Sequence, residues 1–116
     1  VPHPFEKVRK GLQQPVLDDI AELVDIIEVH NGRAFGSRAG RQALAWAAKR
    51  GVALAASSDA HGWHGWGKTF SMVEEAPAAD RLALLLKRPL HRSGLRRVGL
   101  RGRLYPKLNR LRKKRS

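Results

Sequence analysis

A short segment near the middle of the chain, Ser58-Asp59-Ala60-His61, carries two side chains of the kinds that bind metal ions. In an extended backbone, residues two apart point to the same side, so Asp59 and His61 can converge on one point. A carboxylate with an imidazole suits Zn²⁺, Mn²⁺ or Fe better than Ca²⁺. Short Asp-x-His matches are common, however, so the spacing alone leaves a second interpretation open. In it, Asp59 caps a turn and His61 is an ordinary loop residue.

Other polar residues lie where segments that we expect to be strands come to an end. His3, between two prolines, is a candidate third metal ligand, and the alternative is an exposed terminal histidine. Asn31 and Arg33 follow an apolar run, where an arginine can clamp a phosphate through two hydrogen bonds or simply be solvated. His64 lies in a loop rich in glycine and tryptophan, and either faces a substrate or contacts nothing. The substrate-binding candidates are therefore Asn31, Arg33 and His64.

The elements that must position these residues alternate along the chain. The apolar, β-branched run at 24–29 is typical of a strand buried on both faces, and its mid-strand Glu28 then needs a partner. Gly51 is expected to end the helix predicted over 41–50. Strands alternating with helices predict a parallel α/β arrangement, with sites at the carboxyl ends of the strands. We expect helices over 16–23, 41–50 and 78–87, and strands over 24–29, 52–56 and 68–73.

Charge is distributed very unevenly along the 116 residues. The chain has 23 Lys and Arg against 10 Asp and Glu, a formal net charge of +13, with 42% hydrophobic residues. All ten acidic groups lie in residues 1–86 with ten basic ones, and the other thirteen basic groups lie in residues 87–116. The chain is thus a neutral body with a basic tail. With no cysteine, it has no disulfide scaffold, cysteine nucleophile or Cys-ligated zinc.

The basic tail carries leucines at helical spacing, namely Leu104, Leu108 and Leu111. This pattern predicts an amphipathic helix within 105–115 that binds RNA, DNA or an anionic membrane. In the alternative, the leucines dock on the body and the charges stay solvated. We divide the chain into a domain at 1–87 and a tail at 88–116. The longest apolar stretches are too short for a transmembrane helix.

The start of the chain is unusual for a complete domain. It begins with Val1 rather than Met and goes directly into a dense motif, Pro2-His3-Pro4-Phe5. No charged n-region or apolar h-region of a secretory signal is present. We therefore expect a cytoplasmic protein of which this chain is a fragment.

Four segments taken in order resemble the C-terminal half of a PHP domain, from the polymerase and histidinol phosphatase superfamily of metal-dependent phosphoesterases. The resemblance covers roughly residues 1–75. It implies the C-terminal part of a distorted (β/α)7 TIM-like barrel, in which two or three divalent metal ions lie at the carboxyl ends of the strands. His3, Asp59 and His61 match metal ligands of the family, and residues 28–33 match a strand end whose Asn and Arg line the cleft. The segments are Pro2-His3-Pro4-Phe5, Ile27–Arg33, Ala43–Ala47 and Ser57–His61.

The chain also departs from the family pattern. Gly40 stands where many members have Asn, and the family's upstream His-x-His pair, a further His and a bridging Glu are not in this sequence. We therefore expect weak metal binding and little or no hydrolysis by these residues alone. In an intact domain, the resemblance implies attack by a metal-bound water on a phosphorylated small molecule, nucleotide or oligonucleotide. The alternative function is a non-enzymatic module whose basic tail binds an anionic partner.

Overall fold

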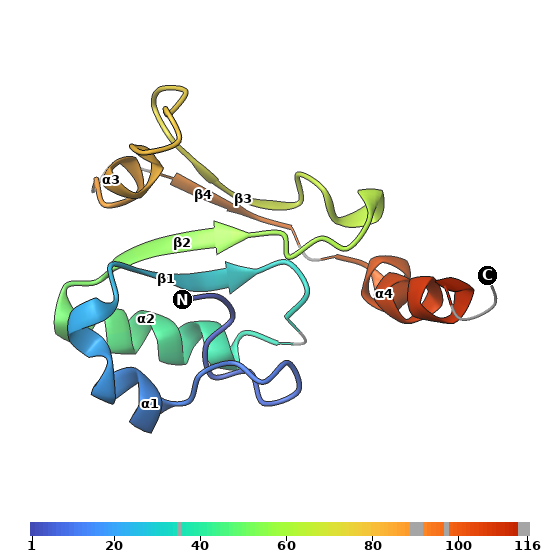
Figure 1. Cartoon of the computed structure of the whole chain (residues 1–116), viewed down its shortest axis with the longest axis horizontal. Coiled ribbons are helices and arrows are strands. Elements are labelled where there is room, and N and C mark those ends of the chain that lie inside the picture. Colours follow the sequence, from blue (N-terminus) through green and yellow to red (C-terminus); the bar gives the residue numbers. More distant parts are fainter. Residues whose placement is uncertain (35, 89–91, 97, 114–116) are drawn as a thin grey trace.

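The computed structural model describes residues 1–34, 36–88, 92–96 and 98–113, a mixed α/β arrangement of helices and two small sheets (Figure 1). Two short 3-10 turns, η1 (Ala21–Leu23) and η2 (Trp63–Gly65), complete it. The described residues form no closed barrel. The helices and strands are α1 (Gln14–Asp19), β1 (Ile26–Asn31), α2 (Arg38–Arg50), β2 (Ala53–Ser57), β3 (Thr69–Met72), α3 (Leu82–Leu86), β4 (Arg92–Leu95) and α4 (Leu100–Lys113).

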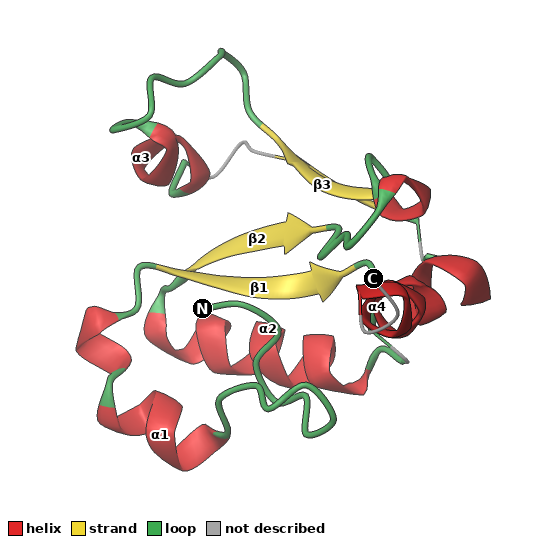
Figure 2. Cartoon of the chain, turned by 45° about the vertical axis from the view of Figure 1, so that its right-hand side comes forward, coloured by secondary structure: helices red, strands yellow, loops and turns green. Residues whose placement is uncertain are grey.

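The centre of the fold is a β1–α2–β2 unit. β1 and β2 pair in parallel, as the alternation of helices and strands predicts, and the register shifts by one residue between Glu28 and His30. Helices α1 and α2 lie on one side of this pair and β3 on the other (Figures 1 and 2). Because both strands run the same way, their carboxyl ends meet at one edge, where Asn31 and Ser57 end them.

The core lies between β1 and α2. Ile27 and Val29 of β1 are buried with Ala43, Trp46 and Ala47 of α2. Removing this apolar surface from water is the main favourable contribution to the stability of the unit. It fixes the position of β1, and with it the position of the polar residues at the end of the strand.

The buried face of α2 differs from the one that the sequence predicts. Of Leu44, Ala47 and Ala48, only Ala47 is buried, since Leu44 is 47% exposed and Ala48 is exposed too. Trp46 turns inward instead, and its indole Nε1–H donates to Asp18 at 2.7 Å. A large ring that also finds a hydrogen-bond partner takes precedence over a leucine at the helix surface.

The ends of the predicted elements move by a few residues. Pro15 lies in the first turn of α1 and Gly51 caps α2 with a φ of 66°, both as expected. However, α2 begins at Arg38 rather than Arg41, and the predicted helix 16–23 is divided into α1 and η1. β1 starts and ends two residues later than predicted, which places Asn31 inside the strand.

The first residue extends the parallel ladder on the free edge of β1. The Val1 amino group donates to the Ile26 carbonyl at 2.7 Å, and the Glu28 N–H donates to the Val1 carbonyl at 3.0 Å. In parallel strands, a residue forms hydrogen bonds with the residues before and after the one that it faces, and Val1 does this with β1. His3 therefore follows a strand-like residue, at the same edge as the ends of β1 and β2.

A second sheet was only partly predicted. β3 lies where a third strand is expected, but its partner is β4, which pairs with it antiparallel from within the basic tail. The Arg92-Ser93-Gly94-Leu95 sequence has neither alternation nor β-branched residues, so it carries no strand signal. Residues 89–91, in the predicted tail, lie outside the described residues. The boundary between residues 87 and 88 stays a prediction.

The tail helix is longer than the sequence predicts. α4 begins at Leu100 rather than near Tyr105 and includes Pro106, whose ring faces the carbonyl four residues earlier, at Gly102. Residues 114–116 lie beyond the described part. No described helix has the length and apolar character needed to cross a membrane.

Gly40 is where α2 comes closest to β1, and we expect Gly40→Ala to destabilise the protein. A Cβ there would lie 2.3 Å from the Val29 carbonyl oxygen, which is rigid backbone. Overpacking of this kind costs about 1–3 kcal/mol and outweighs the better helix propensity of alanine. The measurement is urea unfolding, with Gly36→Ala as control because its Cβ would meet nothing within 4 Å. Equal stability of Gly40→Ala and the unaltered chain would contradict this close contact.

Candidate functional site

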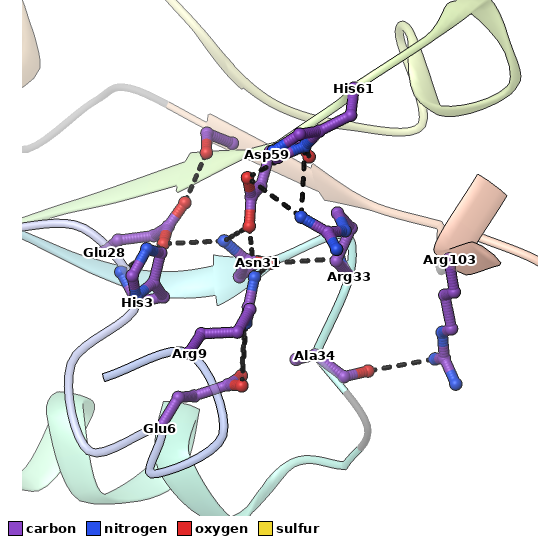
Figure 3. Close-up of polar contacts among 11 residues, drawn as sticks. His3, Glu6, Arg9, Glu28, Asn31, Arg33, Ala34, Asp59, His61 and Arg103 are labelled. Atoms are coloured by element: carbon purple, nitrogen blue, oxygen red, sulfur yellow. Dashed lines mark hydrogen bonds and ion pairs between the residues drawn. The ribbon is translucent and has the colours of Figure 1, made fainter. Parts of the chain in front are cut away.

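A polar cluster lies at the carboxyl edge of β1 and β2 (Figure 3). Asn31, the last residue of β1, is its centre, since Asn31 Nδ2 donates to Glu28 Oε2 at 2.9 Å and to Asp59 Oδ2 at 3.4 Å. Asp59 lies two residues beyond the end of β2. The two strand ends are thus joined through one amide group, at the edge where parallel α/β folds place their sites.

Glu28 is buried at 7% exposure and accepts three hydrogen bonds. Its donors are the His3 backbone N–H at 2.6 Å, Asn31 Nδ2, and the Ser57 hydroxyl. The expectation that this carboxylate needs partners is confirmed, and they are mainly neutral donors. Burial lowers the pKa of the Val1 amino group nearby, an effect that the negative charge of Glu28 partly offsets.

Arg9 is a member of the cluster that sequence reasoning missed. Its guanidinium forms an ion pair with Asp59, donates to Asn31 Oδ1 at 2.7 Å and pairs with Glu6 at 2.6 Å. The Arg9 side chain is only 12% exposed. Arg9 lies in an irregular loop whose sequence has no hydrophobic periodicity. The one available signal was that Arg9 is a basic residue close to His3 in sequence.

Arg33 and His61 complete the open side of the cluster. Arg33 Nη1 lies 3.6 Å from Asp59 Oδ1 and 3.0 Å from His61 Nδ1. His61 Nδ1 is also 3.0 Å from the Asp59 carbonyl oxygen and 3.6 Å from Asp59 Oδ1. His61 is about half exposed, so this is the side from which a ligand can approach.

Two of the predicted metal ligands have strained backbones. His3 has a φ of 28° and Asp59 a φ of 48°, in the left-handed region that non-glycine residues rarely adopt. The other such residues in the described part are Phe5 and Lys10, in the loop that carries Arg9. Strain of this kind costs about 1–3 kcal/mol for each residue and occurs often at functional sites.

A cavity of about 130 Å³ opens beside the cluster. His3 Nδ1 is buried and, among the described residues, has no hydrogen-bond partner. A buried nitrogen without a partner is unfavourable, and a water molecule or a ligand in the cavity would satisfy it. The residues around the cavity include His3, Glu28, His30, Asn31, Ser37 and Leu44.

The cluster fits only part of a metal site. In the described ranges, no group of three His, Asp or Glu side chains is arranged to hold a metal ion. Asp59 and His61 form a two-donor pair that suits one side of such a site. The remaining space around the Asp59 carboxylate is taken by the guanidiniums of Arg9 and Arg33. His3, although near Glu28, does not complete a ligand set with the pair.

His64 lies away from this cluster. Its ring stacks on Trp63, with centroids 3.7 Å apart, and meets Tyr105 of α4 edge-on at 6.1 Å. Its placement thus serves the contact between η2 and α4. The structure brings together five of the six residues singled out as site candidates, His3, Asn31, Arg33, Asp59 and His61, by direct contact or through Glu28.

Comparison with protein-family models, with curated proteins and with solved structures finds no match for this chain. The resemblance to the PHP superfamily therefore stays a hypothesis, carried by the residues themselves.

We expect Arg9→Gln to destabilise the fold, because it leaves Glu6 without its cation and Asp59 with Arg33 alone. The loss is about 1.5–3 kcal/mol, the range for hydrogen bonds to charged groups. Urea unfolding measures it, with Arg41→Gln as the matched control. Arg41 is exposed, and the side-chain bond described for it goes only to Ser37, one turn earlier. Equal effects of the two variants would show that Arg9 contributes nothing beyond an exposed arginine.

Proposed function

We propose that this chain is the C-terminal part of a PHP-type metal-dependent phosphoesterase. Its strand ends would supply one side of the metal and phosphate site of a TIM-like barrel, and the remaining ligands would come from other residues. The observation that carries the proposal is the convergence of three segments distant in sequence. At one edge of a parallel strand pair, Glu28 joins His3 to Asn31, and Asn31 contacts Asp59.

The cluster has some of the groups that phosphoester chemistry requires of a protein. Arg33 presents a guanidinium beside the half-exposed His61, where it can donate two parallel hydrogen bonds to phosphate oxygens. The Asn31 side chain orients the Asp59 carboxylate. The backbone N–H of Arg33 in turn donates to Asn31 Oδ1 at 2.9 Å. In such enzymes, bound divalent ions supply an activated water and stabilise the leaving oxygen.

The substrate that fits this proposal is a phosphate ester, in a small metabolite, a nucleotide or an oligonucleotide. The two cationic groups nearest Asp59 would favour an anionic ligand. They contain no feature that selects a base or a sugar. The divalent ion would be Zn²⁺, Mn²⁺ or Fe, as the Asp and His donors favour.

Metal titration of the 116-residue chain tests the contribution of the two donors. We expect weak Zn²⁺ or Mn²⁺ binding by isothermal titration calorimetry, because two donors already face two arginines. Asp59→Asn or His61→Ala should abolish the measurable binding heat. Asp80→Asn, which removes an exposed carboxylate outside the cluster, should leave it unchanged. Binding that survives in both cluster variants would contradict the assignment.

Activity is tested in the full-length gene product. We expect Asp59→Ala with His61→Ala to remove both bound metal and phosphatase activity, because each of these side chains would coordinate a metal ion. Metal content by elemental analysis and release of inorganic phosphate are the two measurements. Unchanged values of both would refute the proposal.

A further inference from the structure

Among the described residues, helix α4 packs closely on the body through Gly102 and Tyr105. A Cβ on Gly102 would lie 2.2 Å from Val98 Cγ1 and 3.5 Å from His64 Cβ, so the helix backbone packs closely there. Tyr105 covers Gly62, whose own Cβ would meet the ring at 2.5 Å. These contacts orient α4 and determine which of its faces points away from the body.

The leucines lie on the opposite face. Leu100, Leu104, Leu108 and Leu111 are 72%, 42%, 52% and 60% exposed. At 3.6 residues per turn, the four leucines fall within an arc of about 80°, and the centre of this arc lies about 130° around the helix axis from Gly102 and Tyr105. Docking of the leucines on the body, the alternative that the sequence left open, is thus not how the described residues are arranged.

Basic residues border the leucine stripe on both sides. Arg101 follows one margin of the arc and Lys107 the other, and both are exposed. Residues 87–116 contain no acidic residue at all. A leucine stripe between margins of lysine and arginine is typical of helices that lie in the plane of a membrane interface.

We infer that α4 binds an anionic lipid surface, with its leucines among the acyl chains and its basic margins at the headgroups. The observations favour lipid over nucleic acid because phosphates would satisfy the charges but leave the leucine stripe in water. Charge complementarity favours an acidic surface over a neutral one. This inference is independent of the proposed phosphoesterase activity, since it uses no residue of the Asp59 cluster.

Flotation of the whole chain with vesicles tests the inference. We expect binding to vesicles of phosphatidylcholine with 30% phosphatidylglycerol, and much weaker binding to phosphatidylcholine alone. The pair Leu104→Gln with Leu108→Gln should lower the partition coefficient by more than about tenfold, since each leucine loses its burial in lipid. Leu23→Gln, at an 81% exposed leucine in η1, is the matched control and should bind normally.

Charge variants provide a second, independent measurement. Replacing Arg101 and Lys107 by Gln should lower binding to the anionic vesicles by about 25-fold, about fivefold for each residue. Raising the salt concentration should weaken binding by the unaltered chain. Circular dichroism checks that each variant keeps its helix. Because the leucine and charge variants change different side chains, one of them still tests the inference when the other variant unfolds.

Three results would overturn the inference. The first is equal binding to both vesicle types. The second is that the chain binds single-stranded oligonucleotide but not vesicles, and that the leucine variants bind the oligonucleotide as well as the unaltered chain does. The third is a dimer that depends on the leucines, seen by light scattering, without vesicle binding. Asp59→Asn should bind vesicles normally, so failure of the phosphoesterase proposal leaves this result unaffected.

Discussion

The carboxylate of Glu28 is the constraint on which the edge of the sheet depends. A buried carboxylate is costly unless donors replace the water that it loses. Three donors meet it, and each belongs to a different part of the chain, the His3 backbone, Asn31 and the Ser57 hydroxyl. Satisfying one charge therefore brings the first residues, the end of β1 and the end of β2 to one place. This requirement acts together with the burial of Phe5 in the core and the backbone pairing of Val1 with β1, which also hold the N-terminal segment in place.

The charges around Asn31 explain why the cluster can be both stable and receptive to a ligand. Of its three carboxylates, Glu6 and Asp59 pair with the two guanidiniums of Arg9 and Arg33, whereas Glu28 accepts hydrogen bonds from neutral donors. At formal charges the cluster is thus left with one excess negative charge, which favours an added cation. The guanidiniums also compete with that cation for Asp59, because an ion pair in a partly buried site is strong. A divalent ion would have to displace an arginine, and that arginine would then be available for an anionic substrate.

Sequence reasoning predicted the parts of this structure that local patterns encode. The apolar runs predicted β1 and β2, Gly51 predicted the end of α2, and the Asp-x-His segment was correctly placed beyond a strand. Sequence reasoning missed the features that depend on contacts between residues far apart in the sequence. Arg9 reaches Asp59 fifty residues later from a loop without periodicity. The inward turn of α2 depends on a Trp46 bond to Asp18, and β4 becomes a strand only because β3 pairs with it. The tail helix was also predicted to begin near Tyr105, five residues after the start of α4 at Leu100.

The neutral body and the basic tail are joined at the loop that carries Arg33. Arg103 of α4 donates to the Ala34 carbonyl at 2.9 Å (Figure 3). The Val98 N–H donates to the Gly32 carbonyl at 2.9 Å. The residues on both sides of Arg33 are therefore anchored to the docked end of α4. Since the leucine face of that helix points away from these anchors, a surface that binds the leucines would not cover the loop. It would instead restrict the motion of α4. Through the Arg103 side-chain bond to Ala34 and the Val98 backbone bond to Gly32, it would steady the guanidinium that faces Asp59.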